Sequence, residues 1–374
     1  MKLKKLLLPA LSFGMALFAS GLLVAFSDSK VLALKSQPLE MLQKAFATAG
    51  DAYWALFRGS IFDPQLAQDR FIEGFYPFSE TLVAATPLIL TGLSVALAFK
   101  AGLFNIGAQG QFIAGAIGAS WVGFTFELPV VIHTLAAMAA AIIFAGMYGG
   151  LVGLLKARTG AHEVIVTIML NYVALNFLTW HLPTPELLLE ANGGGTPKSD
   201  PPADTAMLPT LFGDMYKIHI GIFFAVAAAF IYWLLMDRSA IGYRFKMVGH
   251  NMSAARAAGI KVESTFIWAM AVSAAFAGLA AANQGLSETG GITTSINANI
   301  GFDAITVALL GGNSAKGIFA AGLLFGAFKA GSPAMQVAGV SPEILGVVQA
   351  LIVLFIAAPP LIKAFFRLPE PEVK

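Results

Sequence analysis

Three amide side chains lie in an otherwise apolar stretch, AGLFNIGAQGQ: Asn105, Gln109 and Gln111. No charged residue occurs from Ala101 to Phe126. An amide both donates and accepts hydrogen bonds, so it can bind a neutral polar solute without requiring a charge on that solute. Polar groups in hydrocarbon are costly and tend to face a cavity or a partner. These amides are therefore predicted either to line a path for a small polar solute or to cap broken helices and join neighbouring ones.

Further polar residues in apolar surroundings extend this candidate path. Neutral amides make weak contacts, which suit a conduit better than a tight binding site because the solute must leave again. Helix capping and bonding between helices remain the alternative role for every member. The candidate residues of the substrate pathway are Asn105, Gln109, Gln111, Asn171, Asn283, Asn299 and Asp303.

A basic segment at residues 237–263, DRSAIGYRFKMVGHNMSAARAAGIKVE, indicates a different chemistry. The residues from Ser253 to Ala258 are small and favour a helix, Asn251 is a suitable N-cap, and Gly259 is a suitable stop. A short helix with a nearly smooth surface, bounded by bases, suits docking into a groove on another protein. An ordinary basic loop is the alternative. The residues predicted to dock are Asn251, Ser253, Ala254, Ala255, Arg256 and Gly259.

The sequence offers no pattern of catalytic or metal-binding residues. It contains no cysteine, which excludes disulfides, thiolate catalysis and cysteine-based metal sites. His162 and Glu163 begin an HExxH pattern, but Val166 stands where the second histidine would be. We therefore expect no enzyme activity, no metal and no cofactor in this chain.

The composition indicates a protein whose main solvent is lipid. Hydrophobic residues make up 57% of the chain and charged residues 12%, with a mean hydropathy of +0.76. Soluble globular domains carry about 25% charged residues. The net charge of +2, without any basic run, argues against a nucleic-acid partner.

Charge-free intervals map the elements that must position these residues. A membrane span needs about 20 apolar residues, and most of the intervals reach that length. A signal peptide is the alternative interpretation of the first interval, but no clear cleavage site precedes Asp28. Short apolar pieces around 311–317 predict a hairpin of short or broken helices. We predict an all-α polytopic membrane protein of about ten transmembrane helices. The intervals are 6–27, 82–99, 101–126, 128–155, 164–185, 218–236, 264–287, 304–315, 317–328, 330–342 and 344–362.

Lysines and arginines orient the predicted spans by the positive-inside rule. The lysines at the amino terminus and the basic segment 237–263 are placed in the cytoplasm, and with ten spans the carboxyl terminus lies there too. Residues 28–80, expected to form short helices, and the loop 183–216 are placed outside. Ten spans divide into five plus five of opposite orientation, the arrangement of an inverted repeat with the solute path between its halves. In that scheme 101–111 corresponds to 283–303.

The segment SAARAAG at residues 253–259 resembles the EAA-type loop of ABC importer permeases, although Ser253 stands where that motif has glutamate. The longer stretch GYRFKMVGHNMSAARAAGIKV is similar to the branched-chain amino acid, ribose and nucleoside permease family. Three further stretches resemble the same family: residues 86–119, 162–174 and 301–327. The sequences GLFNIG, followed by GQ, and EVIVTIMLNY look most like the nucleoside-type branch.

This resemblance implies a set of partners. Such permeases pair into a two-subunit, often heterodimeric, membrane domain in the cytoplasmic membrane. They bind an ATPase through a short coupling helix, and they receive substrate from an extracytoplasmic binding protein or lipoprotein. No Walker motif occurs in this chain, so ATP must be hydrolysed by a separate subunit.

The expected function is therefore ATP-driven alternating access for nucleosides, with purine nucleosides as the main expectation. A permease for a simple sugar or another small polar solute is one alternative. A self-sufficient secondary transporter is another, and it would need an intramembrane carboxylate to bind a coupling ion. Asp303 and Glu163 are the carboxylates in question.

Overall fold

A computed structural model describes residues 2–68, 70–184, 197–213, 215–287, 291–296 and 298–357. Within these ranges the regular structure is helical, apart from one isolated β-bridge between Thr210 and His219, so the all-α prediction is confirmed. Parts of the predicted outer loop, of the stretch 283–303 and of the carboxyl terminus lie outside the described residues. The chain forms two compact units, one of Leu82–Gly326 and one of Met1–Thr81 with Ala327–Lys374, and each is considered by itself.

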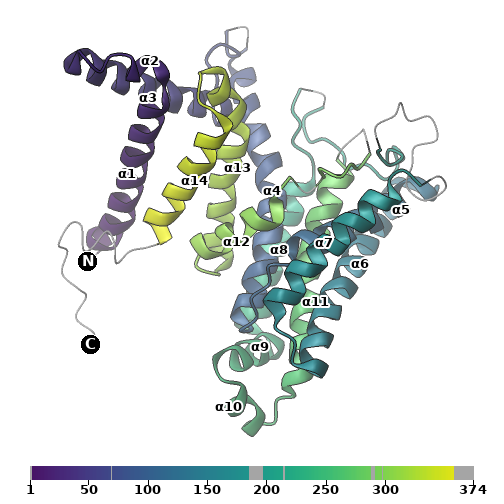
Figure 1. The fold of residues 1–374 in the computed structure, drawn as a ribbon. Coiled ribbons are helices and arrows are strands. Elements are labelled where there is room, and N and C mark those ends of the chain that lie inside the picture. The colour runs from purple at the N-terminus through teal and green to yellow at the C-terminus, as the bar shows by residue number, and fades with distance from the viewer. Residues whose placement is uncertain are drawn as a thin grey trace. The chain divides into compact units, whose positions relative to one another are not determined.

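The unit Leu82–Gly326 holds the helices that carry the predicted site residues (Figure 1). They are most of α4 (Tyr76–Lys100), α5 (Ala108–Thr125), α6 (Val130–Thr159), α7 (Glu163–His181), α8 (Gly221–Trp233), a π-helical turn (Leu234–Arg238), α9 (Ala240–His250), α10 (Met252–Ala257), α11 (Val262–Gly285), α12 (Ile300–Leu310) and the first part of α13 (Ala315–Val337).

Helices α5, α6 and α11 pack closely against one another within this unit. Small residues permit the close approach of α6 to α11. A Cβ atom added to Gly153 would lie 2.6 Å from the Cα of Ile267 and 2.7 Å from the carbonyl oxygen of Phe266. Because both obstacles are backbone atoms, they cannot swing aside, and glycine at this position sets the distance between the two helices.

We expect Gly153→Ala to lower the free energy of unfolding relative to Gly146→Ala by about 1–3 kcal/mol, the usual range for overpacking. Both glycines lie inside α6, so the gain in helix propensity is the same. A Cβ on Gly146 would meet only the carbonyl oxygen of Ala271, at an ordinary 3.5 Å. Thermal unfolding of the two variants in detergent measures the difference, and equal midpoints would contradict the close packing of α6 on α11.

The second unit contains α1 (Lys2–Ser27), α2 (Ser29–Leu32), α3 (Pro38–Ser60), a 3-10 helix (Phe71–Phe75) and α14 (Pro342–Ala357). Helix α1 packs against both α3 and α14, and the Tyr53 hydroxyl of α3 donates a 2.5 Å hydrogen bond to the carbonyl oxygen of Leu17. Residues 28–80 were expected to form short helices, but α3 has 23 residues. It extends further because apolar positions such as Ala45 and Ala52 recur on its buried side across the intervening charges.

Six helices in the described part of the chain are long and apolar enough to cross a membrane. Their residues are Phe71–Lys100, Val130–Thr159, Glu163–His181, Gly221–Arg238, Val262–Gly285 and Ala315–Val337; shorter apolar helices occur at Gly14–Ser27, Ile300–Leu310 and Pro342–Leu351. A polytopic protein is thus supported, while the count of ten spans, the inverted repeat and the cytoplasmic position of both termini remain predictions.

One detail of the predicted hairpin around 311–317 is wrong. Helix α12 is short, with 11 residues, as expected, but α13 runs unbroken for 23 residues through Lys329. The charge-free intervals divided this segment at that lysine. A helical backbone continues past an isolated lysine because the long side chain can carry its charge away from an apolar face.

Candidate functional site

The amide of Asn105 lies in the break between α4 and α5 and is completely buried. Its nitrogen donates to Gln111 Oε1 at 3.0 Å and to Ser273 Oγ at 3.1 Å. Its oxygen accepts from the backbone N–H of Gly107 at 3.0 Å and from Gln111 Nε2 at 3.1 Å. An amide has two donor and two acceptor positions, so the bonding capacity of Asn105 is fully used within the chain.

This amide pair joins three helices. The hydroxyl of Ser273, on α11, donates to the carbonyl oxygen of Ser94, on α4, at 2.7 Å and accepts from Asn105. Gln111, on α5, is 1% exposed. The geometry therefore favours the helix-joining role for Asn105 and Gln111, since neither can meet a solute without breaking a buried hydrogen bond.

Asn171 supports the same break from α7. Its nitrogen donates to the carbonyl oxygen of Ile106 at 2.9 Å, and its oxygen accepts from the backbone N–H of Gly110 at 2.8 Å. The first N–H groups of a helix lack partners within that helix. Asn171 thus supplies a partner to the start of α5 from a residue far away in the sequence.

Gln109, in the same stretch, uses its oxygen in a hydrogen bond and leaves its nitrogen without one in the described part of the chain. Its Oε1 accepts from the backbone N–H of Gly301 at 3.1 Å, which ties α5 to the first turn of α12. Its Nε2 has no hydrogen-bond partner among the described residues, and the side chain is 9% exposed. Nearby, Asn299 precedes α12 with a left-handed backbone at φ 62° and is exposed, while Asp303 in the first turn is partly buried.

A second polar position combines Asn283, at the end of α11, with His219, just before α8. Both side chains are buried, at 4% and 5% exposure, and neither Asn283 Nδ2 nor His219 Nε2 has a hydrogen-bond partner in the described part of the chain. A Cβ on Gly221 would lie 2.7 Å from His219 Nδ1 and even closer to Asn283 Nδ2, so the two side chains meet at that glycine.

Both unpaired atoms at this position are donors. His219 Nδ1 accepts from the backbone N–H of Gly221 at 3.2 Å, which leaves the ring proton of the neutral imidazole on Nε2. An unpaired buried donor costs about 1–3 kcal/mol. A solute that brings an acceptor to these two donors, such as a carbonyl, a ring nitrogen or a hydroxyl, would therefore be favoured. The sequence prediction included Asn283 but missed His219, because the two residues are far apart in the chain and nothing in the sequence around either one indicates that they meet.

Burial lowers the pKa of His219 from its ordinary value of 6.5 to about 4. The unfolded chain therefore binds a proton between these two pH values while the folded protein does not, and stability is lost as the pH falls from 6.5 towards 4. We expect the thermal midpoint in detergent to fall between pH 7.5 and pH 5, and to fall less in His219→Gln. An equal fall in both proteins would contradict a buried neutral histidine.

The basic segment forms two helices, α9 and α10, rather than an ordinary loop. The side chain of Asn251 accepts from the backbone N–H of Ala254 at 3.0 Å, as an N-cap does, and Gly259 ends the turn with a left-handed φ of 80°. Both the cap and the stop are confirmed. Within α10, Ala255 is buried, while Arg256 is exposed and pairs with Glu263 at 2.6 Å.

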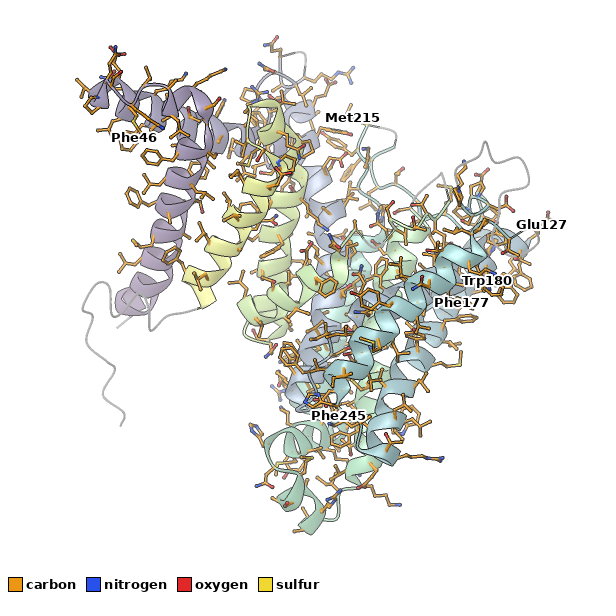
Figure 2. The ribbon with its side chains drawn as sticks, viewed as in Figure 1. Phe46, Glu127, Phe177, Trp180, Met215 and Phe245 are labelled. Atoms are coloured by element: carbon orange, nitrogen blue, oxygen red, sulfur yellow. The ribbon has the colours of Figure 1, made fainter. Side chains whose placement is uncertain are left out.

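Helix α9 rests directly on the start of the stretch 101–111. Its residues Phe245, labelled in Figure 2, and Val248 are buried. A Cβ on Gly249 would lie 2.5 Å from the carbonyl oxygen of Lys100 and 2.7 Å from the backbone nitrogen of Gly102. This backbone-to-backbone contact connects the predicted coupling segment to the break that holds the amides.

Ion pairs reinforce that connection. Asp237, in the π-helical turn, lies 3.7 Å from Lys100 Nζ, at the end of α4, and 3.2 Å from Lys246 Nζ, on α9. The carboxylate therefore holds the end of α4 and the middle of α9 at the same place. A displacement of α9 would act on α4 through charge as well as through packing.

Glu163 is also paired. Its Oε2 lies 2.6 Å from Lys156 Nζ, and the residue is 9% exposed. A carboxylate neutralised by a fixed cation is poorly suited to bind and release a coupling ion. In the described part of the chain, no group of three or more histidines, aspartates or glutamates is arranged to hold a metal ion.

A family profile described as branched-chain amino acid transport system / permease component matches residues 78–357. The chain is 38% identical over 335 residues to a guanosine ABC transporter permease protein of Bacillus subtilis (strain 168), covering 88% of this chain and 91% of the relative. It is 37% identical over 285 residues to a nucleoside ABC transporter permease protein of Lactococcus lactis subsp. cremoris, covering 74% and 78%. It is 33% identical over 291 residues to a glucose ABC transporter permease protein of Haloferax volcanii, covering 75% and 76%. No solved structure matches.

Proposed function

Because this chain belongs to the family of branched-chain amino acid transport system permease components, we propose that it carries nucleosides, above all purine nucleosides, through an ABC importer. A member of this family is a non-catalytic transport subunit of the cytoplasmic membrane, and it works with an ATPase and a substrate-binding protein. The predictions of an ABC permease, of a multi-pass membrane location and of no enzyme activity are confirmed.

The nucleoside assignment rests on the similarity to the guanosine permease, which extends over 88% of this chain. The site geometry is compatible with it. Asn283 and His219 present two unpaired donors, and Gln109 presents one more. A purine nucleoside carries acceptors both on its base and on its sugar, so such donors can be used without any charge on the solute.

The proposed mechanism is alternating access driven by the partner ATPases. The ATPase docks on α10, and α9 transmits its movement to the end of α4 and to the break at 101–107 through the contact of Gly249 with Gly102. The amide network around Asn105 keeps α4, α5 and α11 joined while the break moves. The second permease subunit, proposed to be a different chain, would complete the path.

Glucose or another simple sugar is the second candidate solute, because a glucose permease is 33% identical to this chain. A sugar also carries hydroxyls that accept from the same donors. What distinguishes the two is the base, whose ring nitrogens and carbonyl provide acceptors that a sugar lacks.

Reconstitution of the chain with its ATPase, second permease and binding protein in vesicles tests this function. We expect ATP-dependent uptake of labelled guanosine, with little uptake of labelled glucose. Preferential uptake of glucose would overturn the nucleoside assignment while leaving the family role intact. Uptake of either solute without the ATPase would contradict an importer of this class.

A further inference from the structure

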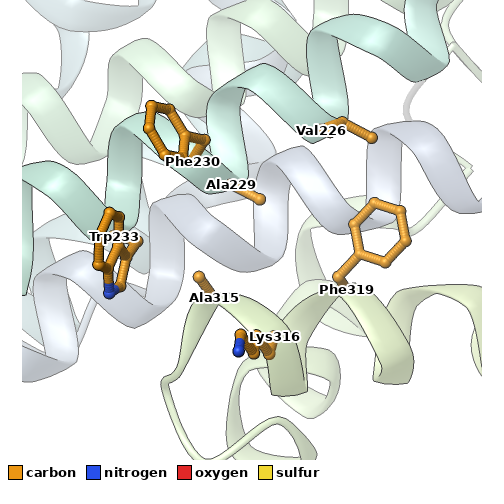
Figure 3. A pocket seen from close by; sticks show the side chains of 7 residues that line it. All are labelled: Val226, Ala229, Phe230, Trp233, Ala315, Lys316 and Phe319. Atoms are coloured by element: carbon orange, nitrogen blue, oxygen red, sulfur yellow. The ribbon is translucent and has the colours of Figure 1, made fainter.

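An apolar groove of about 730 Å³ lies between α8 and the first turns of α13 (Figure 3). One face of α8 lines it at helical spacing, and the other wall comes from α13. The lining residues are Val226, Ala229, Phe230, Trp233, Ala315, Lys316 and Phe319. Another face of α8, with Ala225, Ala228 and Tyr232, is buried inside the unit. The groove is therefore on the outside of the packed helices, with Phe230 57% exposed.

Two cationic side chains, Lys316 and Arg238, lie at one end of this groove. Lys316 lies in the first turn of α13, and the Arg238 guanidinium lies 5.2 Å from the centre of the Trp233 ring. Both side chains are exposed, and neither has an ion pair among the described residues. The groove thus combines a long apolar surface with an uncompensated positive charge at its mouth.

The placement of these groups along the helices matches the layers of a bilayer. Helices α8 and α13 are both candidate spans, with Arg238 and Lys316 at their ends. Tryptophan is enriched at the level of lipid headgroups, and basic side chains at span ends extend into that layer. Phe230, Val226 and Phe319 would then face hydrocarbon, while Trp233 and the two cations face the headgroups.

We propose that this groove binds an anionic phospholipid, with one acyl chain along Phe230 and Val226 and the headgroup phosphate between Lys316 and Arg238. Basic pockets between transmembrane helices are a recurring means of holding acidic headgroups. A helix of another subunit would have to supply carboxylates opposite both cations, whereas an anionic lipid brings the charge and the chain in one molecule. This site is independent of which solute the permease carries.

Quenching of tryptophan fluorescence by brominated lipids tests the proposal on the purified chain in nanodiscs. Four other tryptophans also contribute to the total fluorescence, so the contribution of Trp233 is taken as the difference between the parent chain and Trp233→Phe. Brominated phosphatidylglycerol is expected to quench this contribution at least twofold more strongly than brominated phosphatidylcholine at the same mole fraction. The excess should disappear in Trp233→Phe, which removes the reporter, and in the double variant Lys316→Gln with Arg238→Gln. Arg158→Gln, which removes an exposed base at the end of α6, should retain the excess.

Three results would overturn the proposal. Equal quenching of the Trp233 contribution by the two lipids would show that charge does not select the occupant, and weak quenching of that contribution by both would show that something other than lipid fills the groove. An undiminished excess in Trp233→Phe would place the lipid elsewhere. If the double variant does not fold, Lys316→Gln alone decides, since Lys316 is exposed and should halve the excess.

Discussion

Replacing Gly259 by tryptophan is expected to reduce ATP-driven uptake about tenfold or more while leaving membrane insertion intact. A Cβ on Gly259 would meet no atom within 4 Å, so a side chain can start from this position without a clash in this chain. It would lie next to α10, whose exposed residues Ser253, Ala254 and Arg256 are proposed to dock the ATPase. A loss of about 1.4 kcal/mol in docking free energy corresponds to a tenfold weaker complex. Uptake and co-purification of the ATPase measure the effect.

The matched control for this substitution is Gly259→Asn. The backbone at Gly259 is left-handed, with φ 80°, and any side chain other than asparagine or aspartate is strained there. Asparagine tolerates the conformation and adds little bulk, so it should keep most of the uptake and the ATPase. Normal transport by the tryptophan variant would count against docking at α10, and equal losses in both variants would indicate backbone strain instead.

Asn105→Leu is expected to lower the free energy of unfolding by about 3 kcal/mol or more. Leucine leaves Gln111 and the backbone N–H of Gly107 buried without their partner, and each such loss costs about 1–3 kcal/mol. It also removes the link from α5 to Ser273 of α11. Thermal unfolding in detergent and the yield of folded protein report this change.

Gln109→Leu provides the contrast, since Gln109 makes one hydrogen bond, to Gly301, and keeps its Nε2 available. We expect a smaller loss of stability but a larger loss of uptake per folded molecule than for Asn105→Leu. The comparison separates an amide that holds helices together from one that is proposed to face the solute. If both variants lose stability equally and transport normally once folded, neither amide belongs to the path.

The sequence by itself determined the properties that depend on composition and on neighbouring residues. Low charge and long apolar runs specify a membrane protein, because the cost of burying a charge in hydrocarbon does not depend on the fold. Asn251 and Gly259 mark the ends of α10 because a cap and a left-handed stop act within one helical turn. The motifs shared with importer permeases are likewise continuous stretches of sequence.

Tertiary structure decided which polar groups are available to bind a solute, because the hydrogen-bond partners of each group come from residues far away in the chain. Asn105 is bonded to Ser273, Asn171 to Ile106 and Gln109 to Gly301, and none of these pairs is apparent from spacing. The meeting of His219 with Asn283 depends on the start of α8 lying against the end of α11. An amide in an apolar run has the same sequence signature whether its hydrogen bonds are satisfied or open, and only packing distinguishes the two.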